Sequence, residues 1–232
     1  MFKSFKNEKY GDMKVNEMSN TINQHHFEIH LTVNLEASNS SLENFINFCT
    51  VAGIKPIVIG FDNNGHKHVM TSDTTRCTLN EVYSIAAHQT LFLEEAGFKV
   101  IRVKIEADPS IVKSRPDVML TSPDYCYVET HILCNTDNLK KQLEVVKELS
   151  LVLDDGTFVN PHISKNEFKQ DKTFITYRSK ALVDFDHLYQ DIYTRLLDLN
   201  VISHASKIEL KVCIYDSNVT LDKQWMTQHY DY

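Results

Sequence analysis

The sequence lacks a long apolar run, and its first 20 residues are too polar for a signal peptide. It has five cysteines and no CxxC pair, which is typical of reduced thiols and not of a disulfide framework. It also lacks an excess of positive charge, since the formal net charge is −7, and broad nucleic-acid binding needs a basic surface. These absences predict a soluble, cytoplasmic protein that does not bind nucleic acids broadly or enter a membrane.

Several enzyme motifs are missing as well. The chain has no glycine-rich phosphate loop, no Ser-His-Asp order and no nucleophile elbow. What it does contain is ordinary for a packed globular protein, with 42% hydrophobic and 24% charged residues among 232. Function must therefore be sought in the pattern of the strands.

Predicted strands and helices follow one order twice. Residues 27–33 alternate apolar and polar side chains, as a strand buried on one face does. Further strands are predicted at 55–61, 66–72 and 98–106, with helices at 42–51 and 79–95 and an Asn-Gly turn at 62–65. After several prolines the pattern restarts, with strands at 125–134, 157–164, 173–179 and 207–215 and helices at 138–149 and 185–199.

Both runs have the order βαββαβ. The sequence therefore predicts an α+β fold of two tandem duplicated ferredoxin-like units, with antiparallel sheets and helices on one face of each. Each unit opens on a Glu-x-His strand, Glu28 to His30 and Glu129 to His131. The predicted divisions are a flexible tail at 1–24, a first half at 25–108, a linker at 109–123 and a second half at 124–232.

Strand alternation predicts a charged face. If Phe27 and Ile29 pack under the helices, Glu28, His30 and Thr32 point away from them. The same argument adds charged residues from two other strands, namely Arg102, Lys104, Glu106, Glu209 and Lys211. Arg178 ends a strand that is expected to run close to a Glu-x-His strand. Such a face is either a cleft for a small anionic ligand or nucleotide, or a row of solvated cross-strand ion pairs.

The residues His30-Leu31-Thr32-Val33 resemble the His-hydrophobic-Thr-hydrophobic motif of the 2H phosphoesterase superfamily. The resemblance implies that His30 and His131 act as general acid and base, and that Thr32 helps to hold a phosphate. In the second motif Leu133 stands where the family has a hydroxyl residue. The stretch from Phe27 to Trp225 also resembles a group of uncharacterised bacterial proteins; this resemblance implies a single fold and gives no indication of the activity.

Three functions stay open. The first is a metal-independent phosphoesterase or phosphate-transfer enzyme acting on a nucleotide or an RNA end, without a cofactor. Its catalytic residues would be His30, His131, Glu28 and Glu129, and its ligand-binding residues Thr32, Arg102, Lys104, Arg178 and Lys211. The second is a non-catalytic binding module for a small anionic ligand. The third is a metalloenzyme with His and Glu ligands, to which His66 and His68 could contribute.

Overall fold

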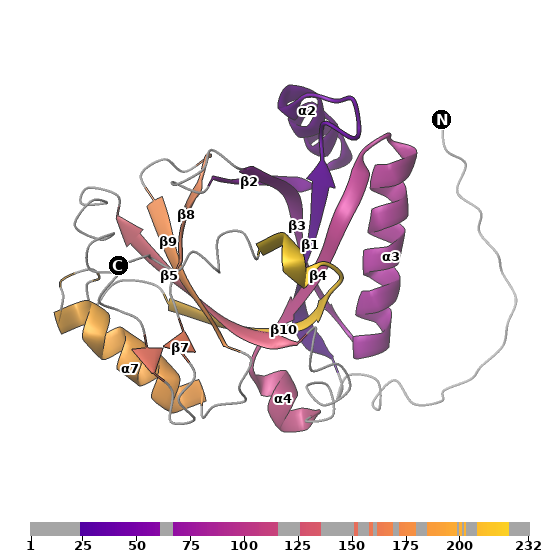
Figure 1. Ribbon diagram of the computed structural model, residues 1–232. Coiled ribbons are helices and arrows are strands. Elements are labelled where there is room, and N and C mark those ends of the chain that lie inside the picture. Colours follow the sequence, from indigo (N-terminus) through magenta and orange to yellow (C-terminus); the bar gives the residue numbers. More distant parts are fainter. Residues whose placement is uncertain are drawn as a thin grey trace, which may run out of the picture.

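The strands of the protein close into one antiparallel barrel (Figure 1), with the order β1-β3-β2-β8-β9-β5-β10-β4. The computed structural model describes residues 24–60, 67–115, 126–135, 151–152, 158–159, 162–168, 172–179, 185–198, 200, 202 and 208–222. The barrel strands are β1 (His25–Asn34), β2 (Lys55–Gly60), β3 (Lys67–Cys77), β4 (Lys99–Ala107), β5 (Tyr127–Asn135), β8 (His162–Asn166), β9 (Lys172–Ser179) and β10 (Ile208–Asp216). Two short strands, β6 (Leu151–Val152) and β7 (Phe158–Val159), pair separately.

Helices lie outside the barrel wall, as Figure 1 shows for α2 and α3. They are α2 (Leu42–Ala52), α3 (Leu79–Glu95), α4 (Ser110–Ser114) and α7 (Phe185–Asp198). The chain then continues from β10 into the 3-10 helix η2 (Val219–Asp222). Local sequence explains their ends: the Ser41 side chain caps α2, and Thr78 and Glu81 form a capping box on α3. None of the helices in the described part of the chain is long and apolar enough to cross a membrane.

The hydrophobic core lies between the barrel wall and the helices. Phe27, Ile29 and Leu31 on β1 are at most 1% exposed and belong to one cluster with Phe45 of α2 and Leu93 of α3. Because successive side chains of a strand point to opposite faces, the polar residues between them point into the barrel. The apolar core on the outside of β1 therefore dictates what lines the inside.

The predicted fold of two tandem ferredoxin-like α+β units with open sheets is wrong. The edges that it leaves free pair with each other: β2 meets β8 through Ile59 and Asn166, and β4 meets β10 through Ala107 and Val212. Unpaired edges expose backbone N–H and C=O groups, and closure gives these groups partners. Alternation shows which face of a strand is apolar but not which edges meet, so the sequence pattern missed the barrel.

Individual elements agree better with the sequence than the fold does. The predicted strands at 27–33, 98–106 and 207–215 lie within one or two residues of β1, β4 and β10, and the helix at 79–95 has the bounds of α3. The predicted strand at 157–164 is divided between β7 and β8. The helix at 138–149, the turn at 62–65 and all but the last residue of the tail at 1–24 lie outside the described residues.

Replacing Ile29 by Ala tests the core. Ile29 is fully buried, so we expect its truncation to lower the free energy of unfolding by about 2–5 kcal/mol, measured by urea denaturation. The control is Val51→Ala on α2, where the side chain is 91% exposed; this change should alter the free energy of unfolding by at most about 0.5 kcal/mol. Equal losses in the two variants would contradict the packing described.

Candidate functional site

The barrel encloses a cavity of about 300 Å³. All nine residues predicted as site residues line this cavity, and they come from five strands: Glu28, His30, Thr32, Arg102, Lys104, Glu129, His131, Arg178 and Lys211. Barrel closure brings them together, since β4 lies between β1 and β10, and β5 between β10 and β9. The cleft expected between two open faces is thus the inside of one barrel.

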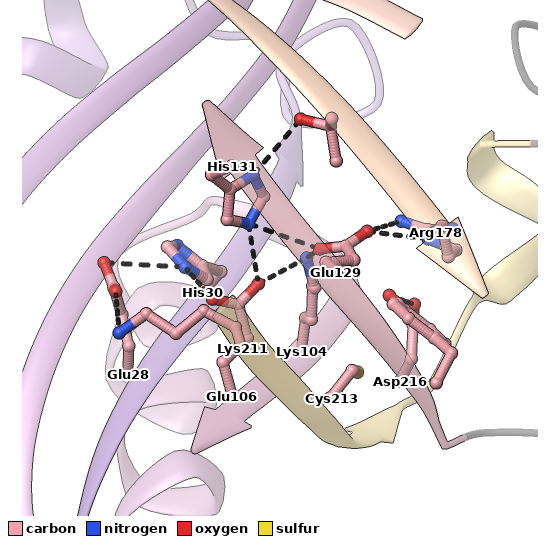
Figure 2. A network of polar contacts seen from close by, with 12 residues as sticks. Glu28, His30, Lys104, Glu106, Glu129, His131, Arg178, Lys211, Cys213 and Asp216 are labelled. Atoms are coloured by element: carbon pink, nitrogen blue, oxygen red, sulfur yellow. Dashed lines mark hydrogen bonds and ion pairs between the residues drawn. The ribbon is translucent and has the colours of Figure 1, made fainter. Parts of the chain in front are cut away.

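Glu106 lies at the centre of the site. Its Oε2 is 3.7 Å from Nε2 of His30, and its Oε1 is 3.9 Å from Nε2 of His131. Figure 2 shows both imidazoles pointing toward this carboxylate. The two Glu-x-His strands therefore converge on one group, and their histidines lie on either side of it.

Lys104 neutralises this centre. Its ammonium lies 2.5 Å from Oε1 of Glu106 and also contacts Oε2 of Glu129. Burial raises the pKa of a carboxyl, but for Glu106 the charge of Lys104 and the two imidazoles outweigh burial and hold the pKa well below its ordinary value. Glu129 behaves in the same way, because Arg178 and Lys104 lower its pKa. Both carboxylates are therefore ionised inside the barrel.

His131 has a defined orientation. Its Nδ1 is 3.1 Å from Oγ1 of Thr176, and its Nε2 is 3.5 Å from Oε2 of Glu129. Burial by itself would lower the pKa of His131, but the carboxylates of Glu106 and Glu129 raise it above the ordinary value. The imidazole thus favours its protonated form more than a free histidine does.

The ion pairs of Glu28 are longer than those that Lys104 forms with Glu106 and Glu129. Oε1 of Glu28 accepts a hydrogen bond of 2.8 Å from Oγ of Ser72 and lies 3.6 Å from Nε2 of His30. Its Oε2 is 3.7 Å from Nζ of Lys211. The Nδ1 atom of His30 is buried and has no hydrogen-bond partner among the residues that the structure describes.

Arg102 and Arg178 each contact two carboxylates. Arg102 contacts Asp216 at 2.5 Å and Asp222 at 2.7 Å, and Arg178 contacts Glu129 and, at 2.7 Å, Asp222. Burial lowers the pKa of Arg102, but the two aspartates outweigh it and raise the pKa. These contacts join strands β4, β5, β9 and β10 to η2.

Sequence reasoning missed part of this network. Glu106 was placed on the charged face by alternation but was not assigned to the site, although it follows Lys104 at the strand period of two. Asp222 could not have been found in this way, because it belongs to η2 and not to a strand. His162 also lines the cavity, and burial followed by the charge of Arg178 lowers its pKa to about 3.

Among the residues that the structure describes, two groups of side chains are close enough together to hold a metal ion. Glu28, His30 and Glu106 form one, and Glu106, Glu129 and His131 form the other; in each, one ligand atom per residue lies within 4.8 Å of the others. Of the histidine pair considered for a metal, His68 lines the cavity 4.0 Å from Asp222, and His66 lies outside the described residues.

Comparisons with known proteins supply no function. No family model matches the chain, and no curated protein matches it. Among solved structures, the chain is similar to a mutant chlorite dismutase from Candidatus Nitrospira defluvii, with 10% identity, 81% of this chain and 90% of that chain covered, and a TM-score of 0.26. A likeness this low carries no argument for this protein.

Replacing Arg102 by Met tests the buried charge network. The change leaves Asp216 without its guanidinium partner and weakens the neutralisation of Asp222, so we expect the free energy of unfolding to fall by about 3–5 kcal/mol in urea denaturation. The control is Lys67→Met, which removes an ion pair of 2.9 Å to Glu167 whose side chains are 47% and 39% exposed. That variant should lose about 1 kcal/mol or less. A loss in the control as large as that in the Arg102 variant would refute the argument.

Proposed function

We propose that the protein is a metal-dependent enzyme that holds one divalent first-row metal ion inside the barrel, on Oε1 of Glu28, Nε2 of His30 and Oε2 of Glu106. One observation carries this proposal: a largely buried imidazole faces two carboxylates at nearly the same distance from each. The distances from Nε2 of His30 are 3.6 and 3.7 Å, longer than hydrogen bonds.

These distances suit a metal ion. Nitrogen and oxygen ligands lie about 2.0–2.2 Å from such an ion, so neighbouring ligand atoms are roughly 3.0–3.5 Å apart. The three atoms need to move only a few tenths of an ångström along the two measured edges to reach that spacing. Imidazole and carboxylate together suit divalent ions such as Mn²⁺, Co²⁺ and Zn²⁺.

The charges of Glu28 and Glu106 also favour a cation between these two residues. Glu28 and Glu106 are direct partners on the neighbouring strands β1 and β4, and like charges directly opposite each other destabilise a sheet unless a cation lies between them. Ser72 holds Glu28 through the hydrogen bond to Oε1, as outer partners of metal ligands do. Lys104 contacts Oε1 of Glu106 and Lys211 contacts Oε2 of Glu28. A divalent ion would therefore bind the other oxygen of each carboxylate and give His30 a bonding partner.

The second group, Glu106, Glu129 and His131, is a weaker metal candidate. The ammonium of Lys104 already bonds to the carboxylates of Glu106 and Glu129 there. A metal ion on that side would have to displace a buried cation, which is costly. The proposal is therefore for one ion, with Glu106 shared between the ion and Lys104.

Three protein ligands leave coordination positions for a substrate oxygen, which the ion would polarise as a Lewis acid. His131, on the other side of Glu106, lines the same cavity. Its Nδ1 is occupied by Thr176, so Nε2 is the atom that could pass a proton to or from a bound substrate.

The hydrolase prediction finds no support in the site. A phosphate is best recognised by paired guanidinium donors, and both Arg102 and Arg178 are already engaged by two carboxylates each. We therefore do not propose a phosphoesterase. Acid–base catalysis by His30 and His131 without a metal stays a prediction, and the metal titration below separates it from the present proposal.

Metal binding is tested by calorimetric titration with Mn²⁺, Co²⁺ and Zn²⁺, using protein purified without a histidine tag and treated with EDTA. We expect one equivalent to bind to the wild type. His30→Ala removes one of three ligands and should weaken binding by at least about 10–100-fold, the range already seen for loss of outer partners. Circular dichroism establishes that the variant is folded.

The matched control is His131→Ala, the same change in the corresponding Glu-x-His pair. It should still bind one equivalent. Failure of the wild type to bind any of the three ions would disprove the proposal, and so would unchanged affinity in His30→Ala. Equal losses in the two histidine variants would move the ion away from Glu28 and disprove the assignment of ligands.

A further inference from the structure

The cavity has a second wall of different character from the metal-binding group. Ile57 and Ile59 of β2, Met70 of β3 and Phe174 of β9 line it, and all four are only partly buried although they point into the barrel. Part of their surface is therefore accessible to a molecule bound in the cavity. At about 300 Å³, this space is at the lower end of the range for ligand pockets, about 300–1,000 Å³. The wall suits the apolar body of a small organic molecule.

Lys211 is held less closely by carboxylates than Arg102 or Lys104 is. Its ammonium lies 3.7 Å from Glu28, whereas the shortest contacts of Arg102 and Lys104 to carboxylates are 2.5 Å or less. A metal ion on Glu28 would draw the charge of this carboxylate away from Lys211. The lysine would then be available to an anionic group bound beside the ion.

The charges of the residues that line the cavity also bear on which ligand it would bind. The ionisable carboxylates of the lining are Glu28, Glu106, Glu129, Glu209 and Asp222, and its lysines and arginines are Lys55, Arg102, Lys104, Arg178 and Lys211. With the histidines neutral, these charges cancel, but Asp216 also contacts Arg102, at 2.5 Å, and adds a sixth carboxylate against the five cations. A bound divalent ion would therefore leave one net positive charge, which suits a monoanion, whereas a phosphate dianion would also need the guanidinium groups that are already occupied.

From these three observations we infer that the substrate is a small organic carboxylate with an apolar body, whose carboxylate bridges the metal ion and Lys211 while the body lies against Ile57, Ile59, Met70 and Phe174. The inference rests on the proposed metal site and adds the class of substrate. It is a class defined by chemistry: one carboxylate at one end, and an aliphatic or aromatic group at the other.

The test uses the full chain loaded with Co²⁺, because ligation of an added carboxylate changes the visible absorption of this ion. Hexanoate, acetate, 1-hexanol and inorganic phosphate are the probes. Hexanoate should bind at least about tenfold more tightly than acetate, since its longer chain buries apolar surface. It should also bind more tightly than 1-hexanol, which has no charge, and than phosphate.

Lys211→Met should weaken hexanoate binding by at least about tenfold, the effect of losing one charged hydrogen bond. The control Lys67→Met removes an exposed lysine whose partner is Glu167, and it should bind hexanoate as the wild type does. Phe174→Ala should weaken hexanoate binding more than acetate binding, because acetate is too short to reach the apolar wall.

Two results would overturn the inference while leaving the metal site in place: Co²⁺ binds but hexanoate does not change its spectrum, or Lys211→Met binds hexanoate as tightly as the wild type. Tighter binding of phosphate or of 1-hexanol than of hexanoate would overturn it as well. If the wild type does not bind Co²⁺ in the first titration, the metal site and this inference both fail. The Co²⁺ spectrum of each variant is recorded before the probe is added, so loss of metal is scored separately from loss of the carboxylate.

Discussion

Burial of charge inside the barrel is the constraint on which the rest of this structure depends. A charged side chain removed from water must be paired, or its burial costs far more than one domain can offset. Lys104 therefore meets Glu106 and Glu129, and Arg102 meets Asp216 and Asp222. The contact of Lys104 with Glu129 joins β4 to β5 across the intervening strand β10, so the network also holds the shape of the wall.

The two Glu-x-His strands have different surroundings although their motifs are alike. Beside His131, the ammonium of Lys104 contacts the carboxylate of Glu129, and the hydroxyl of Thr176 contacts Nδ1 of His131. Both imidazoles face two carboxylates at 3.5–3.9 Å, but no cation contacts both carboxylates beside His30 among the described residues, whereas Lys104 contacts both carboxylates beside His131. This difference is the reason why the proposed metal ion is assigned to the side of His30 and not to the side of His131. It depends on one lysine, since Lys104 lies on the side of Glu106 that faces Glu129.

Closure of the barrel pairs the backbone edges of the strands and also brings the residues of the candidate site together. Pairing of β4 with β10 satisfies two strand edges and also brings Glu106 close to His131. Pairing of β2 with β8 encloses the apolar wall that contains Ile57 and Ile59. The two strand pairings that remove exposed edges therefore also form a cavity with charged residues on one wall and apolar residues on another, where the proposed metal ion and organic carboxylate would find complementary partners.

The sequence by itself determined the faces of the strands. Alternation in β1 put Phe27 and Ile29 in the core and Glu28 and His30 opposite them, because the side-chain period of a strand is two. It could not determine which edges join, since edge pairing depends on backbone groups that are the same for every residue, and so it predicted two open α+β units. Only the tertiary structure decided that the charged faces enclose one cavity, that Asp222 enters it from η2, and that Glu106 lies between the two histidines.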